Sequence, residues 1–263
     1  MFMSKNINLR GTFDSDAELY HSIRPKYPPA LFEKLIAITQ LPQNARLLEI
    51  GPGTGQATEP FVSRGYEVTA VELGSELANV AKKVLANYPN VKIITGAFED
   101  IDLPNNYFDL VFAATAFHWI KPEIRFAKPH QLLRDSGHLA IIHTEHVSDE
   151  NGNEFFFASQ PIYKKYTPNV KDDFRLPRKD DVRPPAIDQN LFSTIQFEKF
   201  PVMTKYTANE YVQLLSTFSD VISLPPGKRQ GFLTDIADVI NTKFGGSIEK
   251  HVAMLLTIAK KRS

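Results

Sequence analysis

The stretch Leu47-Leu-Glu49-Ile-Gly51-Pro-Gly53-Thr-Gly55-Gln56 decides the fold, because an apolar run breaks there into three alternating glycines. Glycine lets the backbone turn sharply and approach a ligand closely. A dinucleotide-binding G-x-G-x-x-G loop would place glycine where this chain has Gln56, and no Gly-Lys-Ser/Thr follows as in a P-loop. The stretch predicts a buried strand that ends in a ligand-binding turn.

Two acidic residues accompany this glycine loop. Glu49 precedes Gly51 by two residues, and Glu72 ends the next apolar run, about twenty residues beyond Gly51. A carboxylate at the second position can accept hydrogen bonds from both hydroxyls of a ribose. The alternative is a tight turn with two surface acids.

Short apolar runs alternate with amphipathic stretches in the first half of the chain, which is typical of a parallel sheet. We predict strands at 46–50, 67–72, 91–95, 108–113 and 138–143. We predict helices at 30–38, 55–63, 75–86 and 122–133, the last closed by a turn at 134–137. Beyond residue 147 we expect an insertion, then a strand at 193–204 and helices at 208–217 and 226–241. Residues 247–259 fit either a strand or a helix.

Composition narrows the class of protein. Thirty Lys and Arg balance thirty Asp and Glu among 263 residues, so no net charge attracts nucleic acid or an anionic membrane. The chain has no cysteine, which excludes a disulfide, a thiolate metal site and a catalytic thiol. No run of about eighteen apolar residues predicts a membrane span. We expect a cytoplasmic protein that acts on a small molecule.

The glycine loop and its acidic residues also resemble the motifs of a known family. Glu49-x-Gly51-x-Gly53-x-Gly55 resembles the first motif of the class I S-adenosylmethionine-dependent methyltransferases, and Glu72 resembles their ribose-binding acid. The segment 95–100 is similar to the one that covers the adenine. Phe117-His118-Trp119 and Tyr20-x-x-x-Arg24-Pro25-x-Tyr27-Pro28 resemble a narrower group, the type 11-like and trans-aconitate methyltransferase-like enzymes.

The resemblance implies a Rossmann-like α/β fold, a mostly parallel sheet with an antiparallel edge strand and helices on both faces. It implies an N-terminal cap at 1–40, a cofactor-binding core at 41–146, an insertion or substrate cap at 147–190 and a C-terminal part at 191–263 that completes the sheet and the acceptor site. It also implies S-adenosylmethionine as cofactor, bound by Tyr20, Arg24, Glu49, Gly51, Gly53, Gly55, Glu72, Leu73, Ala97, Phe98, Ala114 and Phe117.

His118 is the candidate catalytic residue, because it follows the fourth strand at the edge where open parallel sheets bind ligands. Its imidazole could accept a proton from a substrate hydroxyl or amine. The alternative is a histidine that packs beside Trp119 and shapes the pocket. A carboxylate acceptor would need no base. We expect Trp119, Ser216 and Ser219 to line the acceptor pocket.

The predicted function is therefore methyl transfer to a small molecule, with an oxygen such as a carboxylate or hydroxyl favoured over nitrogen. A protein that binds the cofactor without turnover, or less readily an NAD-dependent oxidoreductase, remains an alternative. His143 and His146 would point in different directions on a strand, so we expect no metal site. We expect a monomer or homodimer without nucleic-acid or membrane partners.

Overall fold

The computed structural model describes residues 9–148, 153–167 and 175–262. The chain divides into two compact units, each built from three segments. The sheet unit comprises Lys26–Thr144, Arg183–Phe200 and Met254–Ser263, and the helical unit comprises Met1–Pro25, Glu145–Val182 and Pro201–Ala253.

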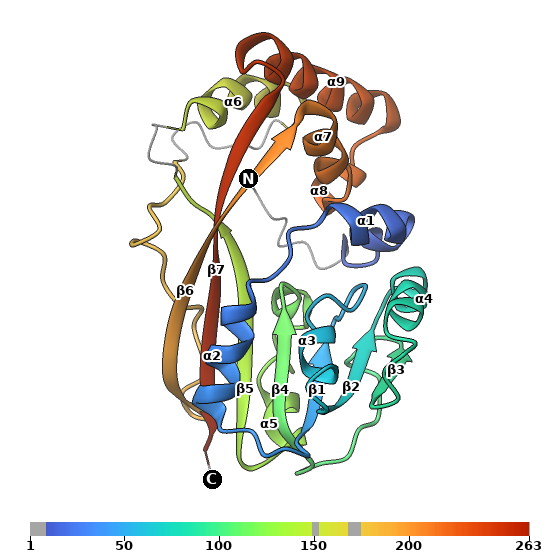
Figure 1. Ribbon diagram of the computed structural model, residues 1–263, viewed down its shortest axis with the longest axis vertical. Coiled ribbons are helices and arrows are strands. Elements are labelled where there is room, and N and C mark those ends of the chain that lie inside the picture. Colours follow the sequence, from blue (N-terminus) through green and yellow to red (C-terminus); the bar gives the residue numbers. More distant parts are fainter. Residues whose placement is uncertain (1–8, 149–152, 168–174, 263) are drawn as a thin grey trace. The chain divides into compact units, whose positions relative to one another are not determined.

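One seven-stranded sheet has the order β3-β2-β1-β4-β5-β7-β6 (Figure 1). The strands β3, β2, β1, β4 and β5 pair in parallel, and β7 runs opposite to β5 and β6. The mostly parallel sheet is confirmed, and the undecided ending of the chain is a strand. The strands are β1 (Arg46–Ile50), β2 (Glu67–Glu72), β3 (Val91–Thr95), β4 (Phe108–Ala114), β5 (Leu133–His146), β6 (Phe192–Thr207) and β7 (Ser247–Lys261).

Helices cover both faces of the sheet within the sheet unit, as predicted. Successive strand residues point to opposite faces. On one face Phe112 of β4 packs against Phe61, which packs against Phe32; these two rings come from α3 (Glu59–Val62) and α2 (Pro29–Thr39). On the other face Val111 shares a core with Leu132 of α5 (Ala127–Leu132) and with Phe117 of the 3₁₀ helix η3 (Phe117–Trp119). Between β2 and β3 lies α4 (Ser75–Val84).

Two predicted helices are shorter than expected. The helix predicted at 55–63 begins only at Glu59, because residues 53–58 form successive turns after the glycines. The helix predicted at 122–133 is reduced to α5, since Pro129 has no N–H to donate to a preceding carbonyl.

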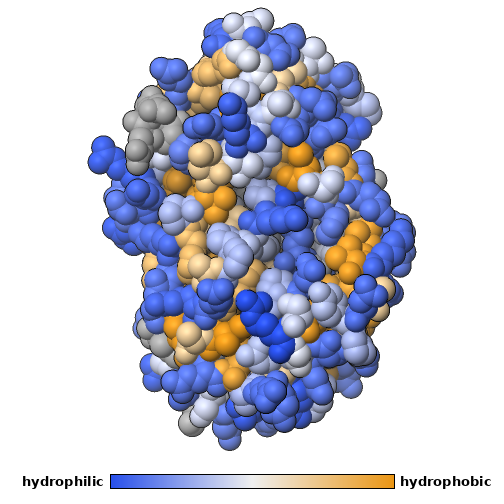
Figure 2. Space-filling view, viewed as in Figure 1, coloured by the Kyte–Doolittle hydropathy of each residue, from blue (hydrophilic) through white to orange (hydrophobic). Residues whose placement is uncertain are grey.

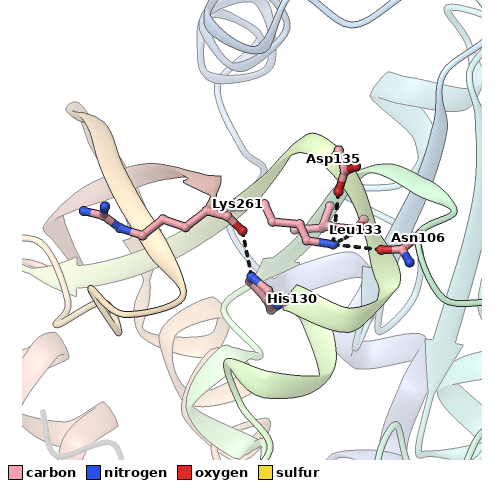
Figure 3. Close-up of polar contacts among 6 residues, drawn as sticks. Asn106, His130, Leu133, Asp135 and Lys261 are labelled. Carbon is pink, nitrogen blue, oxygen red and sulfur yellow. Dashed lines mark hydrogen bonds and ion pairs between the residues drawn. The ribbon is translucent and has the colours of Figure 1, made fainter.

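The turn predicted at 134–137 is wrong, because these residues lie within β5. The register shifts between Phe108 and Leu110 of β4, and Ser136 has φ +64°, so the extra residues form an irregularity in the strand. The buried ammonium of Lys261 donates to the Leu133 carbonyl (2.7 Å) and to Asn106 Oδ1 (2.9 Å), which ties the end of β7 to this irregularity (Figure 3).

The helical unit has its own apolar core. Phe155, Tyr211 and Phe232 are buried there together, contributed by α6 (Glu154–Tyr166), α7 (Ala208–Ser216) and α9 (Pro226–Lys243). Thr207 and Glu210 form a capping box at the start of α7. The remaining elements are η2 (Thr12–Asp16), α1 (Ala17–Ile23) and α8 (Ser219–Ile222). The helices predicted at 208–217 and 226–241 are confirmed.

Large apolar side chains are exposed at only a few described positions, namely Leu73, Tyr107, Phe157 and Met203. The face drawn in Figure 2 accordingly mixes hydrophobic residues with more numerous hydrophilic ones. Within the described ranges, every helix is too short or too polar to cross a membrane.

Candidate functional site

The loops that follow β1, β2 and β4 all lie at the same edge of the sheet, because these strands are parallel. In the order of the sheet, β2 is the neighbour of β1 on one side and β4 is its neighbour on the other. The chain passes from β1 to β2 and β3 in one direction and later to β4 and β5 in the opposite direction, so the switch point of the sheet lies between β1 and β4. Ligands of open α/β sheets bind at such a point, outside the carboxyl ends of the strands. The predicted glycine loop and His118 both follow strands that end here.

The glycine loop needs glycine for two separate reasons. Gly51, Gly53 and Gly55 have φ values of +68°, +57° and +90°, which other residues adopt only with strain. Space is also restricted: a Cβ on Gly51 would lie 2.6 Å from the Cβ of Ala116, which follows β4. The loop is therefore packed directly against the segment that leads to His118.

Glu72 is buried and joins the glycine loop to β2. Its Oε2 accepts the Gly53 N–H (2.8 Å) and its Oε1 accepts the Gly74 N–H (2.9 Å). Leu73 follows with an exposed apolar side chain. The structure thus brings the predicted acid and the glycine loop together.

Glu49 is fully buried, and only one of its oxygens has a protein partner among the described residues. Thr58 Oγ1 donates to Oε2 (2.6 Å), whereas Oε1 accepts no hydrogen bond from them. Burial raises the pKa of Glu49 to about 8, the Thr58 bond lowers it, and the nearby Glu72 raises it. A buried acceptor without a partner is costly, and a cationic ligand group would relieve that cost. Thr58 was not predicted from the sequence, because it follows the glycine loop without a recognised motif.

The segment after β3 is held by a lysine that the sequence analysis also missed. Lys128 Nζ donates to the carbonyls of Phe98 (2.7 Å), Glu99 (3.1 Å) and Ile101 (2.7 Å). Burial lowers the pKa of Lys128, and the nearby acidic side chains oppose that shift. Phe98 is buried and the preceding Ala97 is half-buried. The predicted adenine-covering segment is therefore a fixed turn; nothing in the spacing of Lys128 indicated this role.

His118 lies in η3 beside two other aromatic rings. Its ring centroid is 4.8 Å from that of Trp119 and 6.3 Å from that of His143, at the end of β5. Burial lowers the pKa of His118 to about 4, and His143 and Arg125 shift it in the same direction. The imidazole is therefore neutral near pH 7 and can accept a proton. Arg125 Nη2 donates to the carbonyls of His118 (3.2 Å) and Ile120 (2.8 Å), which fixes η3.

Tyr20, Arg24, Ser216 and Ser219 belong to the helical unit, whereas Ala114 ends β4 in the sheet unit. Arg24 donates through Nε to Thr217 Oγ1 (2.9 Å) and through Nη2 to the Thr217 carbonyl (2.7 Å). Its guanidinium lies over the ring of Tyr20, 4.7 Å from the centroid. Ser216 Oγ donates back to its own helix, and Ser219 is buried. The N-terminal segment and the 216–219 segment are thus joined through Thr217, which the sequence analysis missed.

No group of three or more His, Cys, Asp or Glu side chains suited to a metal ion is found in the part of the chain that the structure describes.

Known proteins provide an independent comparison. The family model of the methyltransferase domain matches residues 48–141. An uncharacterized methyltransferase of Mycobacterium tuberculosis is 34% identical over 232 residues, which cover 88% of this chain and 86% of that protein.

Solved structures show the same fold. A protein assigned as a type II methyltransferase from Anaeromyxobacter dehalogenans has a TM-score of 0.62 at 21% identity, covering 92% of this chain and 98% of its own. A Haemonchus contortus phosphoethanolamine N-methyltransferase, solved with S-adenosylhomocysteine, has a TM-score of 0.51 at 16% identity, covering 95% of this chain and 58% of its own.

These matches favour neither alternative considered from the sequence, the oxidoreductase or the binding protein without turnover. The buried Glu49 oxygen and the Glu72 carboxylate also fit the ammonium and ribose groups of an adenosyl amino acid. A relative this similar over most of both chains, on a shared fold, makes the chain a member of the class I S-adenosylmethionine-dependent methyltransferases, with S-adenosylmethionine as its cofactor.

Proposed function

We propose that this enzyme methylates an oxygen atom of a small molecule, and that the acceptor oxygen is a hydroxyl. The observation that supports this proposal is the neutral, half-buried imidazole of His118 in η3, the 3₁₀ helix that follows β4.

The lowered pKa of His118 favours a hydroxyl oxygen over an amine nitrogen as the acceptor atom. An aliphatic amine is mostly protonated near pH 7, and an imidazole whose pKa is about 4 cannot deprotonate it. A hydroxyl is already neutral, and its proton becomes strongly acidic as the oxygen bonds to the methyl carbon. Even a weakly basic imidazole accepts that proton during the transfer. His118 therefore suits oxygen better than an amine nitrogen.

The donor site is proposed at the carboxyl edge of the sheet unit. S-adenosylmethionine supplies the electrophilic methyl group of its sulfonium. Glu72 would accept hydrogen bonds from the ribose hydroxyls beside Leu73, and Glu49 would accept one from the ammonium group. The glycine loop lets the backbone approach the methionine part. The remaining proposed contacts in this unit are Ala97, Phe98, Ala114 and Phe117.

The acceptor is proposed to be small because the chain has no excess of basic residues, with thirty Lys and Arg against thirty Asp and Glu. Trp119 would form an apolar wall of the acceptor pocket beside His118. Catalysis would depend mainly on holding the acceptor oxygen and the methyl group in line, away from water.

The test measures S-adenosylhomocysteine formation with four panels of acceptors: phenols, aliphatic hydroxy compounds, carboxylic acids and amines. The enzyme, His118→Gln and the control His130→Gln are compared. We expect a hydroxyl acceptor, with turnover lost in His118→Gln and kept in His130→Gln. Methylation of amines alone would refute the oxygen acceptor. Methylation of carboxylates that is unaffected by His118→Gln would refute the hydroxyl and its base.

A further inference from the structure

Thr115, directly after β4, has an unusual backbone conformation. Its φ of +57° lies in the left-handed region, where a β-branched residue is strained. The other described non-glycine residues with positive φ are Gln40, Asn106, Ser136 and Asn153, and none of these is β-branched. Strain of this kind persists only where surrounding contacts enforce it. The contacts of Thr115 therefore indicate which part of the structure depends on its strained conformation.

Contacts from two directions hold Thr115. Its N–H donates to the Ile142 carbonyl (2.8 Å), which extends the pairing of β4 with β5 by one residue. Its Oγ1 is hydrogen-bonded to the Tyr27 hydroxyl (3.0 Å) and lies 3.4 Å from Thr144 Oγ1. All of these residues belong to the sheet unit.

The ring of Tyr27 is held by an aromatic contact. It precedes α2, and its ring packs edge-on against Phe32 at a centroid distance of 6.1 Å. Phe32 in turn packs against Phe61 of α3. Tyr27 belongs to the motif Arg24-Pro25-x-Tyr27-Pro28, but the proposed donor and acceptor sites give its hydroxyl no role.

The strained turn determines where the next residues lie. Immediately after Thr115, the Cβ of Ala116 comes within 2.6 Å of the position that a Cβ on Gly51 would occupy. Phe117 and His118 then begin η3. If Thr115 relaxed to negative φ, the backbone direction would change at this point, and Ala116 would leave its position against the glycine loop.

We propose that Tyr27 is a positioning residue for the donor site. Its hydroxyl bond to Thr115 Oγ1 holds the turn after β4 in the left-handed conformation, and this conformation keeps Ala116 against Gly51 at the methionine end of the cofactor. The inference rests on the donor site proposed above, but it does not depend on the identity of the methyl acceptor.

The test is a double-mutant cycle read by calorimetry with two ligands. S-adenosylhomocysteine has the amino-acid part, and methylthioadenosine lacks it. Tyr27→Phe should weaken S-adenosylhomocysteine binding by about three- to tenfold, the size of one lost hydrogen bond. Methylthioadenosine binding should change less than about twofold, because the turn contacts the loop at the other end of the ligand.

Glycine supplies the decisive comparison, because it adopts positive φ without strain. In a Thr115→Gly background, Tyr27→Phe should cause no further loss of S-adenosylhomocysteine affinity. Thr115→Val, which keeps the β-branch but removes the hydroxyl, should reproduce the loss seen in Tyr27→Phe. Tyr107→Phe, at an exposed position of the same unit, serves as the control.

Two results would overturn the inference: an equal effect of Tyr27→Phe in both backgrounds, or an equal loss for both ligands. A wild-type protein that binds neither ligand would instead refute the donor site itself. The two failures are therefore distinguishable.

Discussion

Replacing Glu49 by glutamine should stabilise the protein without cofactor while weakening its function. Glu49 is fully buried, and its pKa is raised from an ordinary value of 4.5 to about 8. The folded protein therefore keeps a proton on Glu49 over a pH range in which the unfolded chain has lost it. Glutamine is neutral throughout this range, and its amide oxygen can still accept the Thr58 hydroxyl.

The expected size follows from linkage. Below about pH 4.5 Glu49 is protonated in both states, so it has no effect on the pH dependence of stability. Between pH 4.5 and about 8 the folded state retains one more proton, and each pH unit costs about 1.4 kcal/mol of stability. At pH 7 the cost reaches about 3 kcal/mol. Glu49→Gln should therefore raise Tm by about 5–10 °C at pH 7.

The assay is thermal unfolding followed by circular dichroism between pH 5 and pH 8, without ligand. The difference in Tm between Glu49→Gln and the wild type should be small at pH 5 and should grow with pH. Glu67→Gln, an exposed position on β2, is the control and should show no such growth. A difference that does not change with pH would refute the buried, protonated carboxyl. The same variant should bind S-adenosylhomocysteine more weakly, because the ammonium group of the ligand favours the ionised form of Glu49, whereas an amide stays neutral.

Three further predictions follow from the same contacts. Lys128→Met leaves three carbonyls of the turn after β3 without their donor, so methylthioadenosine should bind about tenfold more weakly. Unchanged binding would show that Lys128 does not support the adenine-binding segment. His118→Gln should lower kcat more than it weakens S-adenosylhomocysteine binding. In the wild type, kcat should fall on the acidic side only near pH 4, and a fall centred near pH 6.5 would contradict the lowered pKa of His118. Arg24→Lys should lower Tm by a few degrees, because lysine cannot reproduce the paired bonds to Thr217; an unchanged Tm would show that these bonds contribute little.

Much of the sheet could be predicted from the sequence because its signal is local. The strands from β1 to β4 are short apolar runs bounded by turns, and Gly51, Gly53 and Gly55 mark the loop after β1 directly. The turn predicted at 134–137 failed because its residues form an irregularity within β5, between Leu133 and His138, which pair with Phe108 and Leu110 of β4. Lys261, distant in sequence, donates to the Leu133 carbonyl at this irregularity. A pattern confined to neighbouring residues contains no information about such contacts.

In the candidate site, too, some residues could be predicted from the sequence and others could not. Glu49 and Glu72 could be identified because they stand at fixed spacings from the glycine loop. Lys128 could not, since it donates to backbone carbonyls, and the sequence does not show which carbonyls lie within reach. Thr217 could not either, since its hydroxyl and its own carbonyl accept from Arg24, which is distant in sequence. The strained φ of Thr115 was equally hidden, because threonine ordinarily favours extended backbone. The two compact units were not foreseen either, since each combines three separated segments.

The adenosyl site is tested most directly by calorimetric titration of the wild type, Glu72→Ala and Glu67→Ala with S-adenosylhomocysteine and, separately, with a nicotinamide dinucleotide. We predict micromolar binding of S-adenosylhomocysteine by the wild type and by the exposed control Glu67→Ala. We predict a loss of about 1–3 kcal/mol in Glu72→Ala, the cost of unpaired hydroxyls and of the lost bonds to the glycine loop. Equal affinity in all three proteins, or binding of the dinucleotide alone, would contradict an adenosyl site built from the glycine loop and Glu72.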